Sequence, residues 1–268
     1  MHFGRLLMTI GAGIAVVHAA LTGNDEVPAS SQSSGADKSR NQPAKYFQES
    51  SFSVHYDARF ASQPLNERAQ RDAVRVMVQT YFSTLRDLGV KTWLMHGSLL
   101  GWWWNKQILP WDSDADVQIT ENGIKFLAAY YNMTTWYYKY PRIPAGRYFQ
   151  LEVNPNYARR DGEDPQNAVD ARWIDMENGL FIDITAVSYV KDHPEGEGVL
   201  ASKDGHEYRD TYLYPLLDTT FEGVRVKIPS KYREMLAAEY GEKALTDREY
   251  KDHKFVDDKM EWVPNDEL

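Results

Sequence analysis

The stretch HGSLLGWWWNKQILPWDSDADVQI, residues 96–119, contains the pattern that decides the fold and the chemistry of this chain. Its second half holds three aspartates, Asp112, Asp114 and Asp116, separated by single residues. In an extended segment residues two apart point to the same face, so we expect the three carboxylates to share a face while the apolar side chains between and after them point into the core. Three neighbouring carboxylates repel one another unless a cation or protons intervene. Because hard divalent cations take oxygen ligands, the pattern predicts a Mg²⁺ or Mn²⁺ site.

Other interpretations of this aspartate cluster are a solvated turn and a calcium loop. The spacing Asp-x-Asp-x-Asp opens the loop of an EF-hand, which needs Gly at its sixth position and Glu at its twelfth. Those positions hold Val117 and Gly123, which excludes the EF-hand. In the metal-site interpretation the cation bridges substrate phosphate oxygens and neutralises charge that develops during phosphoryl transfer.

A second carboxylate stands alone in the apolar stretch GLFIDITAV, residues 179–187. Burying Asp183 there without a partner would be costly. One interpretation is a hydrogen-bonded aspartate of the core. The functional interpretation is that strand pairing brings Asp183 beside the first cluster, as a further metal ligand or as a general base.

Several residues near the cluster are candidates for substrate contacts. Gly97 and Ser98 are expected to form a small, flexible turn where backbone amides approach a phosphate. The three consecutive tryptophans 102–104 are typical of packing, with stacking of one ring on a base or sugar as the alternative. Lys106 is either an ordinary surface lysine or a phosphate contact.

The periodicity of apolar residues predicts alternating helices and strands. Residues Asn66–Leu88 carry one helical stripe that ends at Gly89, and a helix capped by Ser230 is expected to end at Gly241. Thr120 is expected to cap a short helix that runs to Tyr131. Short connections between mixed elements indicate a single α/β or α+β domain. The predicted strands lie at 91–95, 117–119, 148–153, 180–190 and 224–228.

Composition narrows the possible functions. The chain has 268 residues, of which 43% are hydrophobic and 13% aromatic, enough for one sizeable core. Its formal net charge is −9, so the chain does not show the excess of basic residues that is typical of nucleic-acid-binding proteins. The absence of cysteine excludes disulfides, cysteine-based zinc sites and a thiol nucleophile.

The N-terminus has the pattern of a secretory signal peptide. Arg5 precedes an apolar run that is too short to span a bilayer comfortably, and small residues allow cleavage after Ala19. We therefore expect a signal peptide over residues 1–19, a flexible linker over residues 20–51 and a folded domain over residues 52–268, with no stable membrane span after cleavage. A membrane anchor and an ordinary N-terminal helix are the alternatives.

Two further motifs concern the secretory pathway. Asn132-Met133-Thr134 is an acceptor sequence for N-glycosylation. The chain ends in Asn-Asp-Glu-Leu, residues 265–268, whose last three residues match the known signals for retention in the endoplasmic reticulum. We expect the protein in the lumen of the endoplasmic reticulum or Golgi, or secreted, with a chance acidic tail as the alternative explanation of the C-terminal residues.

The motifs at residues 96–119 and 179–187, together with FEGVRVKIPSKYREMLAAEYG at residues 221–241, resemble the LicD-type family. That family includes bacterial phosphocholine transferases, fukutin and fukutin-related protein, and fungal proteins of cell-wall mannan mannosylphosphorylation. The resemblance covers roughly residues 81–247, and the sequence in and around the Trp-rich turn is most similar to that of the fungal members. It implies a nucleotidyltransferase-like mixed sheet flanked by helices.

By motif alignment, the resemblance implies that Asp114, Asp116 and Asp183 are catalytic metal ligands, with Asp112 just outside or sharing the site. Family members often carry a basic residue soon after the Leu-Leu-Gly element, where this chain has three tryptophans. We expect Lys106 to take the place of that basic residue and to contact the donor phosphate together with Gly97 and Ser98.

The implied function is transfer of a phosphate-linked group, with mannose 1-phosphate from GDP-mannose as the expected donor group and a cell-wall or glycoprotein glycan as the acceptor. A conventional glycosyltransferase with a DxD motif would instead cleave the sugar C–O bond. A third possibility is a non-catalytic accessory factor for mannosylphosphorylation. No nucleic-acid partner is expected.

Overall fold

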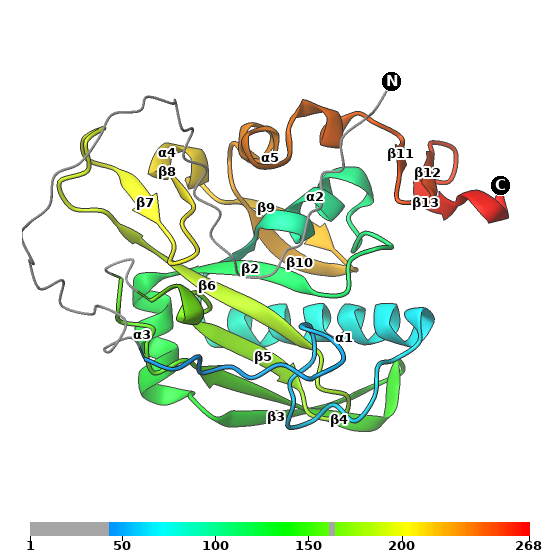
Figure 1. Cartoon of the computed structure of the whole chain (residues 1–268), viewed down its shortest axis with the longest axis horizontal. Helices are drawn as coiled ribbons and strands as arrows, with labels where there is room; N and C mark the ends of the chain where they lie inside the picture. The colour runs from blue at the N-terminus through cyan, green and yellow to red at the C-terminus, as the bar shows by residue number, and fades with distance from the viewer. Residues whose placement is uncertain (1–42, 161–163) are drawn as a thin grey trace, which may run out of the picture.

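The computed structural model describes residues 43–160 and 164–268, which form a single mixed α/β domain. Eight strands make one curled sheet in the order β1-β2-β6-β5-β4-β3, with β7 paired to β6 and β8 paired to β7 (Figure 1). The pair β2–β6 is parallel and the other pairs of this sheet are antiparallel. The strands are β1 (Thr92–Leu94), β2 (Ala115–Thr120), β3 (Thr134–Tyr140), β4 (Ile143–Val153), β5 (Ala171–Asp175), β6 (Phe181–Tyr189), β7 (Val199–Ala201) and β8 (Glu207–Arg209).

Helices flank this sheet (Figure 1). The longest, α1, is capped by Asn66, whose side chain accepts a hydrogen bond from the backbone N–H of Ala69 at 2.9 Å. Its buried face packs on β5 and β6, α3 packs on β2 and β6, and α2 packs on β2 and α5. The helices are α1 (Glu67–Asp87), α2 (His96–Asn105), α3 (Glu121–Tyr130), α4 (Asp210–Leu213) and α5 (Tyr232–Tyr240).

Two smaller sheets complete the domain. The hairpin of β9 (Leu217–Phe221) and β10 (Val224–Ile228) lies against β1 and α1. The C-terminal sheet contains β11 (Glu249–Tyr250), β12 (His253–Val256) and β13 (Glu261–Pro264). In Figure 1 this C-terminal sheet lies beyond the end of α2, far from the β3–β4 edge.

The three tryptophans of α2 pack, as the sequence indicated. The indole N–H of Trp103 donates to the carbonyl of Leu245 at 3.1 Å, and that of Trp104 donates to the carbonyl of Ala244 at 3.0 Å. Trp104 also contacts the ring of Trp262 in β13, with ring centroids 4.8 Å apart. These contacts hold the C-terminal segments against α2, and none of the three rings is needed as a ligand surface to explain its position.

The predicted helices and strands are present, with two local corrections. The helix expected after Ser230 begins at Tyr232, and the Ser230 hydroxyl donates to the carbonyl of Tyr212 at 3.0 Å instead of capping it. The first aspartates of the cluster are not in a strand, because β2 begins at Ala115. Asp112 and Asp114 therefore lie in the loop between α2 and β2.

The expected signal peptide, residues 1–19, and most of the expected linker lie outside the described residues. Residues 43–51, which precede the expected start of the domain, contact it: Phe47 is buried and the backbone N–H of Tyr46 donates to Asn167 at 2.9 Å. Within residues 43–160 and 164–268, no helix combines the length and the apolar character needed to cross a membrane.

Candidate functional site

The parallel pairing of β2 with β6 brings two of the predicted site residues together. Asp116 and Asp183 are register partners in this pair. Neighbouring strands lie about 4.8 Å apart, and register partners point to the same face of a sheet. The two carboxylates therefore lie side by side near the start of both strands. The two strands run next to each other in Figure 1, although β6 follows β2 by more than sixty residues along the chain.

The α2–β2 loop adds the other two aspartates. Asp114 Oδ2 lies 3.0 Å from His55 Nδ1. Asp112 lies against the first turn of α2, because a Cβ atom added to Gly97 would be 3.1 Å from Asp112 Oδ2. The negative charges of Asp112, Asp114 and Asp183 all act on Asp116. Four aspartates thus form one electrostatic cluster.

The pKa values of these carboxyl groups reflect burial and mutual repulsion. Burial, followed by the charges of Asp114 and Asp183, raises the pKa of Asp116 well above its usual range. Burial and Asp114 raise the pKa of Asp112 to about 7. Burial also raises the pKa of Asp183, although Arg172 opposes the shift. Keeping buried carboxylates so close that they repel one another costs folding free energy, and carboxylates with such raised pKa values are a feature of functional sites.

Three basic side chains supply positive charge to the cluster. Arg172 Nε donates to Asp183 Oδ1 at 2.7 Å. The hydrogen bond to Asp114 raises the pKa of His55. Lys251, in the turn of the β11–β12 hairpin, lies near enough to Asp112 for its charge to lower the pKa of that carboxyl. These side chains come from the N-terminal segment, β5 and the C-terminal sheet.

The donor set fits a hard divalent cation, since it consists of carboxylate oxygens whose repulsion a cation would relieve. The aspartate oxygens are not arranged as a preformed metal site, however. A preformed metal site would hold at least three ligand atoms within 4.8 Å of one another. Among the described residues, His96, His206 and Glu239 meet this condition. Asp114 and Asp183 are instead held by His55 and Arg172.

The predicted substrate-contacting residues are placed differently from expectation. Gly97 and Ser98 form the first turn of α2 and not a flexible turn. The hydroxyl of Ser98 accepts a hydrogen bond from the backbone N–H of Asp116 at 3.0 Å, so Ser98 fixes the start of β2. This contact gives Ser98 a positioning role beside the aspartates.

Lys106 is not part of the aspartate cluster. It ends α2 in a left-handed backbone conformation, with φ of 62°. At 1.5 Å per residue, the ten residues of α2 separate it from the first turn by about 15 Å. A phosphate contact by Lys106 remains a prediction from the sequence, and the structure places Lys106 at the far end of α2 from the aspartates.

Sequence reasoning missed the basic residues His55, Arg172 and Lys251. His55 and Lys251 lie in segments with no motif. Arg172 could have been noticed, because it is a lone cation among the apolar residues of the buried strand Ala171–Asp175. The hydroxyl of Tyr240, whose pKa is raised by burial and then by the charge of Glu239, also lies within reach of the charges of Asp116 and Asp112.

Comparison with known proteins adds independent findings. The sequence model of the family described as LicD/FKTN/FKRP, nucleotidyltransferase domain, matches residues 89–231, more than half of the chain. Mannosyltransferase regulator 4 of Saccharomyces cerevisiae is 34% identical over 137 residues, or 50% of this chain. Mannosyltransferase regulator 14 of the same yeast is 31% identical over 142 residues, or 52% of this chain.

A mammalian relative aligns over a longer part of the chain. Ribitol 5-phosphate transferase FKRP of Mus musculus is 25% identical over 211 residues, or 73% of this chain. The aligned parts cover 12% and 15% of the two yeast relatives and 35% of the mouse relative. The chain therefore corresponds to a minor part of each relative, and the matched region contains the four aspartates.

Proposed function

Since the chain belongs to the LicD/FKTN/FKRP nucleotidyltransferase family, we propose that it is a metal-dependent transferase that moves a phosphate-linked group from a nucleotide-activated donor onto a glycan. The observation that carries the proposal is the register of β2 with β6, which sets Asp116 beside Asp183 and next to the loop that holds Asp114. The mouse relative is named a ribitol 5-phosphate transferase, which supports phosphate-linked transfer as the reaction class.

In the proposed site Asp114, Asp116 and Asp183 hold Mg²⁺ or Mn²⁺, with Asp112 at its edge. The ion would supply charge neutralisation at the donor phosphates. An acceptor hydroxyl oxygen attacks the phosphorus that carries the transferred group, and the bond to the leaving nucleoside monophosphate breaks. Lys251, close to Asp112, is the side chain we assign to the donor phosphates, in place of Lys106.

Asp112 is suited to accept the proton of the attacking hydroxyl. Its pKa of about 7 matches the value at which a general base works best near neutral pH. Arg172 holds Asp183 in place from the neighbouring strand β5, and Ser98 ties the backbone of Asp116 to α2. Arg172 and Ser98 are therefore positioning residues for the carboxylates.

The donor that we propose is GDP-mannose, with transfer of mannose 1-phosphate to a cell-wall or glycoprotein glycan. The full chain is incubated with labelled GDP-mannose, an oligomannose acceptor and Mn²⁺, and the released nucleotide is identified. GMP supports the proposal. GDP would show that the sugar C–O bond breaks, as in a conventional glycosyltransferase, and would refute phosphate-linked transfer.

Site assignment is tested with Asp116→Asn, which keeps the size of the side chain and removes its charge. We expect at least about a 100-fold loss of GMP release, as is typical when one electrostatic contact to the transition state is removed. Asp87→Asn is the matched control, because Asp87 lies exposed at the end of α1 and forms only an ion pair with Arg86. Equal activity of both variants would contradict the assignment.

A non-catalytic accessory role is the second candidate, and it is favoured by the two yeast relatives, which are named mannosyltransferase regulators. It predicts that the folded full chain releases neither the nucleoside monophosphate nor the nucleoside diphosphate from any nucleotide-sugar donor, while it raises the rate of a separate mannosyltransferase in a mixed assay. Loss of that stimulation in Asp116→Asn would link the aspartates to the accessory role.

A glycan acceptor is consistent with residence in the lumen of the endoplasmic reticulum or Golgi, which we also propose. Protease treatment of sealed microsomes tests this location, and digestion of the protein without detergent would refute it. Deletion of residues 266–268 then tests retention: a retained protein should move forward to the Golgi or the medium. Identical distribution of truncated and full-length protein would refute retention by these residues.

A further inference from the structure

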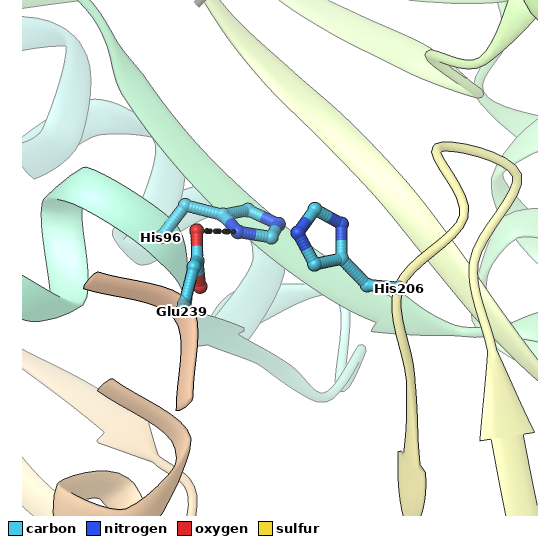
Figure 2. Close-up of side chains that lie close together, drawn as sticks. All are labelled: His96, His206 and Glu239. Carbon is cyan, nitrogen blue, oxygen red and sulfur yellow. Dashed lines mark hydrogen bonds and ion pairs between the residues drawn. The ribbon is translucent and has the colours of Figure 1, made fainter. Parts of the chain in front are cut away.

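A cluster of two histidines and one glutamate lies next to the aspartates but is separate from them. His96 begins α2, His206 directly precedes β8, and Glu239 lies in the last turn of α5. One ligand atom from each side chain lies within 4.8 Å of the other two. Figure 2 shows the two imidazole rings turned toward each other, with Glu239 beneath His96. Three segments far apart in the sequence thus converge at one point.

The cluster contains ring nitrogens that have no hydrogen-bond partner among the described residues. His96 Nδ1 and Glu239 Oε1 are 2.8 Å apart and share a hydrogen bond, but His96 Nε2 is buried and unpartnered. His206 Nδ1 is also buried and makes no hydrogen bond, but it forms an ion pair with Asp204. The ring centroids are 4.6 Å apart and tilted by 51°, which is not a stacking arrangement. A buried polar atom left without a partner costs about 1–3 kcal/mol, so His96 Nε2 requires an explanation.

A fourth side chain stands behind the histidines. Asp204, in the turn between β7 and β8, places Oδ1 3.1 Å from His206 Nδ1 and Oδ2 3.7 Å from His96 Nε2. Neither contact has the alignment of a hydrogen bond. A carboxylate in this position behind a histidine is the arrangement that orients imidazole ligands of metal ions.

We propose that His96, His206 and Glu239 bind one Zn²⁺ ion, with Asp204 orienting His206 from behind. Imidazole nitrogen combined with one carboxylate favours zinc over magnesium, which takes an all-oxygen set. Zinc ligands in a tetrahedral site lie about 3.4 Å apart, given bonds of about 2.1 Å. The present spacing of up to 4.8 Å would close as Glu239 gives up its hydrogen bond with His96 Nδ1 to bind the ion.

Zinc here would tie together the segments that border the aspartate cluster. It would join the β7–β8 turn and α5 to the first turn of α2, which carries Gly97 beside Asp112 and Ser98 beside Asp116. The ion would act as a structural clamp and would not touch the donor. Zinc binding at these three residues would stand whether or not the aspartates catalyse transfer.

The test uses the full chain without a histidine tag, treated with chelator and titrated with Zn²⁺ by calorimetry, with the bound metal counted by mass spectrometry. We expect one equivalent of zinc. His206→Asn and Glu239→Gln should each weaken binding by at least 100-fold, and circular dichroism should show that both remain folded. Co²⁺ in place of Zn²⁺ should give the visible absorption of a four-coordinate site in the unmodified chain only.

Two controls separate this site from its surroundings. His193→Asn alters a histidine at the start of the same β7–β8 region, where it pairs with Glu207, and should leave zinc affinity unchanged. Asp114→Asn removes an aspartate of the proposed transfer site and should also leave it unchanged. Zinc that binds with the same affinity to the His206→Asn chain, or that is lost in Asp114→Asn, would overturn the proposal, as would the absence of stoichiometric zinc.

Discussion

The ion pair between Arg172 and Asp183 gives the most direct test of how the aspartate cluster is held without metal. Arg172 is 3% exposed, donates to Asp183 at 2.7 Å and to Glu49 at 2.9 Å, and lies over the ring of Phe181 at 3.6 Å. Replacing it by Met, which has a similar apolar stem, leaves the partly buried Asp183 without its cation, while Glu49 keeps its ion pair with Lys45. Breaking a buried pair by removing one partner costs about 3–5 kcal/mol.

The expected magnitude for Arg172→Met lies at the lower end of that range. The side chain of Asp183 keeps 25% of its surface exposed and that of Glu49 keeps 15%, so water reaches both carboxylates once the arginine is gone. We therefore expect a loss of about 3 kcal/mol in the free energy of unfolding. Asp183→Asn should cost less, about 1 kcal/mol, because the amide oxygen still accepts from Arg172 and the repulsion on Asp116 falls.

A double-mutant cycle isolates the interaction. In the chain with both substitutions neither charge of the pair remains, so its loss should be smaller than the sum of the single losses by at least about 1 kcal/mol. Urea unfolding in the presence of chelator measures all four free energies. Additive losses, or a loss below about 1 kcal/mol for Arg172→Met, would refute the view that this arginine neutralises the cluster.

Three further predictions follow from single contacts. Lys251→Met should lower kcat/KM about tenfold, mainly through KM, because a charged contact to the donor phosphates is lost. The control is Lys254→Met, which removes a lysine that pairs with Glu249 in the same hairpin and should leave kcat/KM unchanged. Equal kinetics of the two variants would exclude Lys251 from donor binding. Gly101→Ala should lower the unfolding free energy by about 1–3 kcal/mol, because its Cβ would clash with the backbone oxygen of Gln107; an unchanged thermal midpoint would contradict this. Asn132 is exposed and should carry a glycan in the native host, so an unchanged gel mobility after endoglycosidase would count against it.

Much of the fold could be predicted from local pattern. The stripe of α1, with Asn66 before it and Gly89 after it, marks a helix by the spacing of its apolar residues alone. The same holds for β10, where Val224, Val226 and Ile228 alternate with polar residues. Strand β3 was missed because three aromatic residues, 136–138, stand in a row and show no alternation. No residue of this edge strand is fully buried, so burial marks neither face of it as a core face.

Strand order could not be predicted from the sequence, and it decides the site. Local alternation indicates that Asp116 and Asp183 each lie in a strand, but only the packed sheet sets the register that makes them neighbours. The His96, His206 and Glu239 cluster illustrates the same limit, because its members are more than thirty residues apart along the chain and share no spacing. Only residues that are close in sequence, such as Asp114 and Asp116, can be recognised as neighbours from the sequence alone.

The charged residues around the aspartate cluster come partly from the region that matches the family and partly from the segments on either side of it. The matched region, residues 89–231, contains the four aspartates and Arg172, whereas His55 and Lys251 lie outside it. The flanking segments thus bring cations to Asp114 and Asp112, and they also bring Glu49 near Asp183 and Glu239 near Asp116. Since donor phosphates are anions that need positive charge near the metal ligands, differences in donor between relatives are expected to arise in these flanks more than in the shared aspartates. A chimera that keeps residues 89–231 and exchanges both flanks should therefore retain the metal site and change its donor preference.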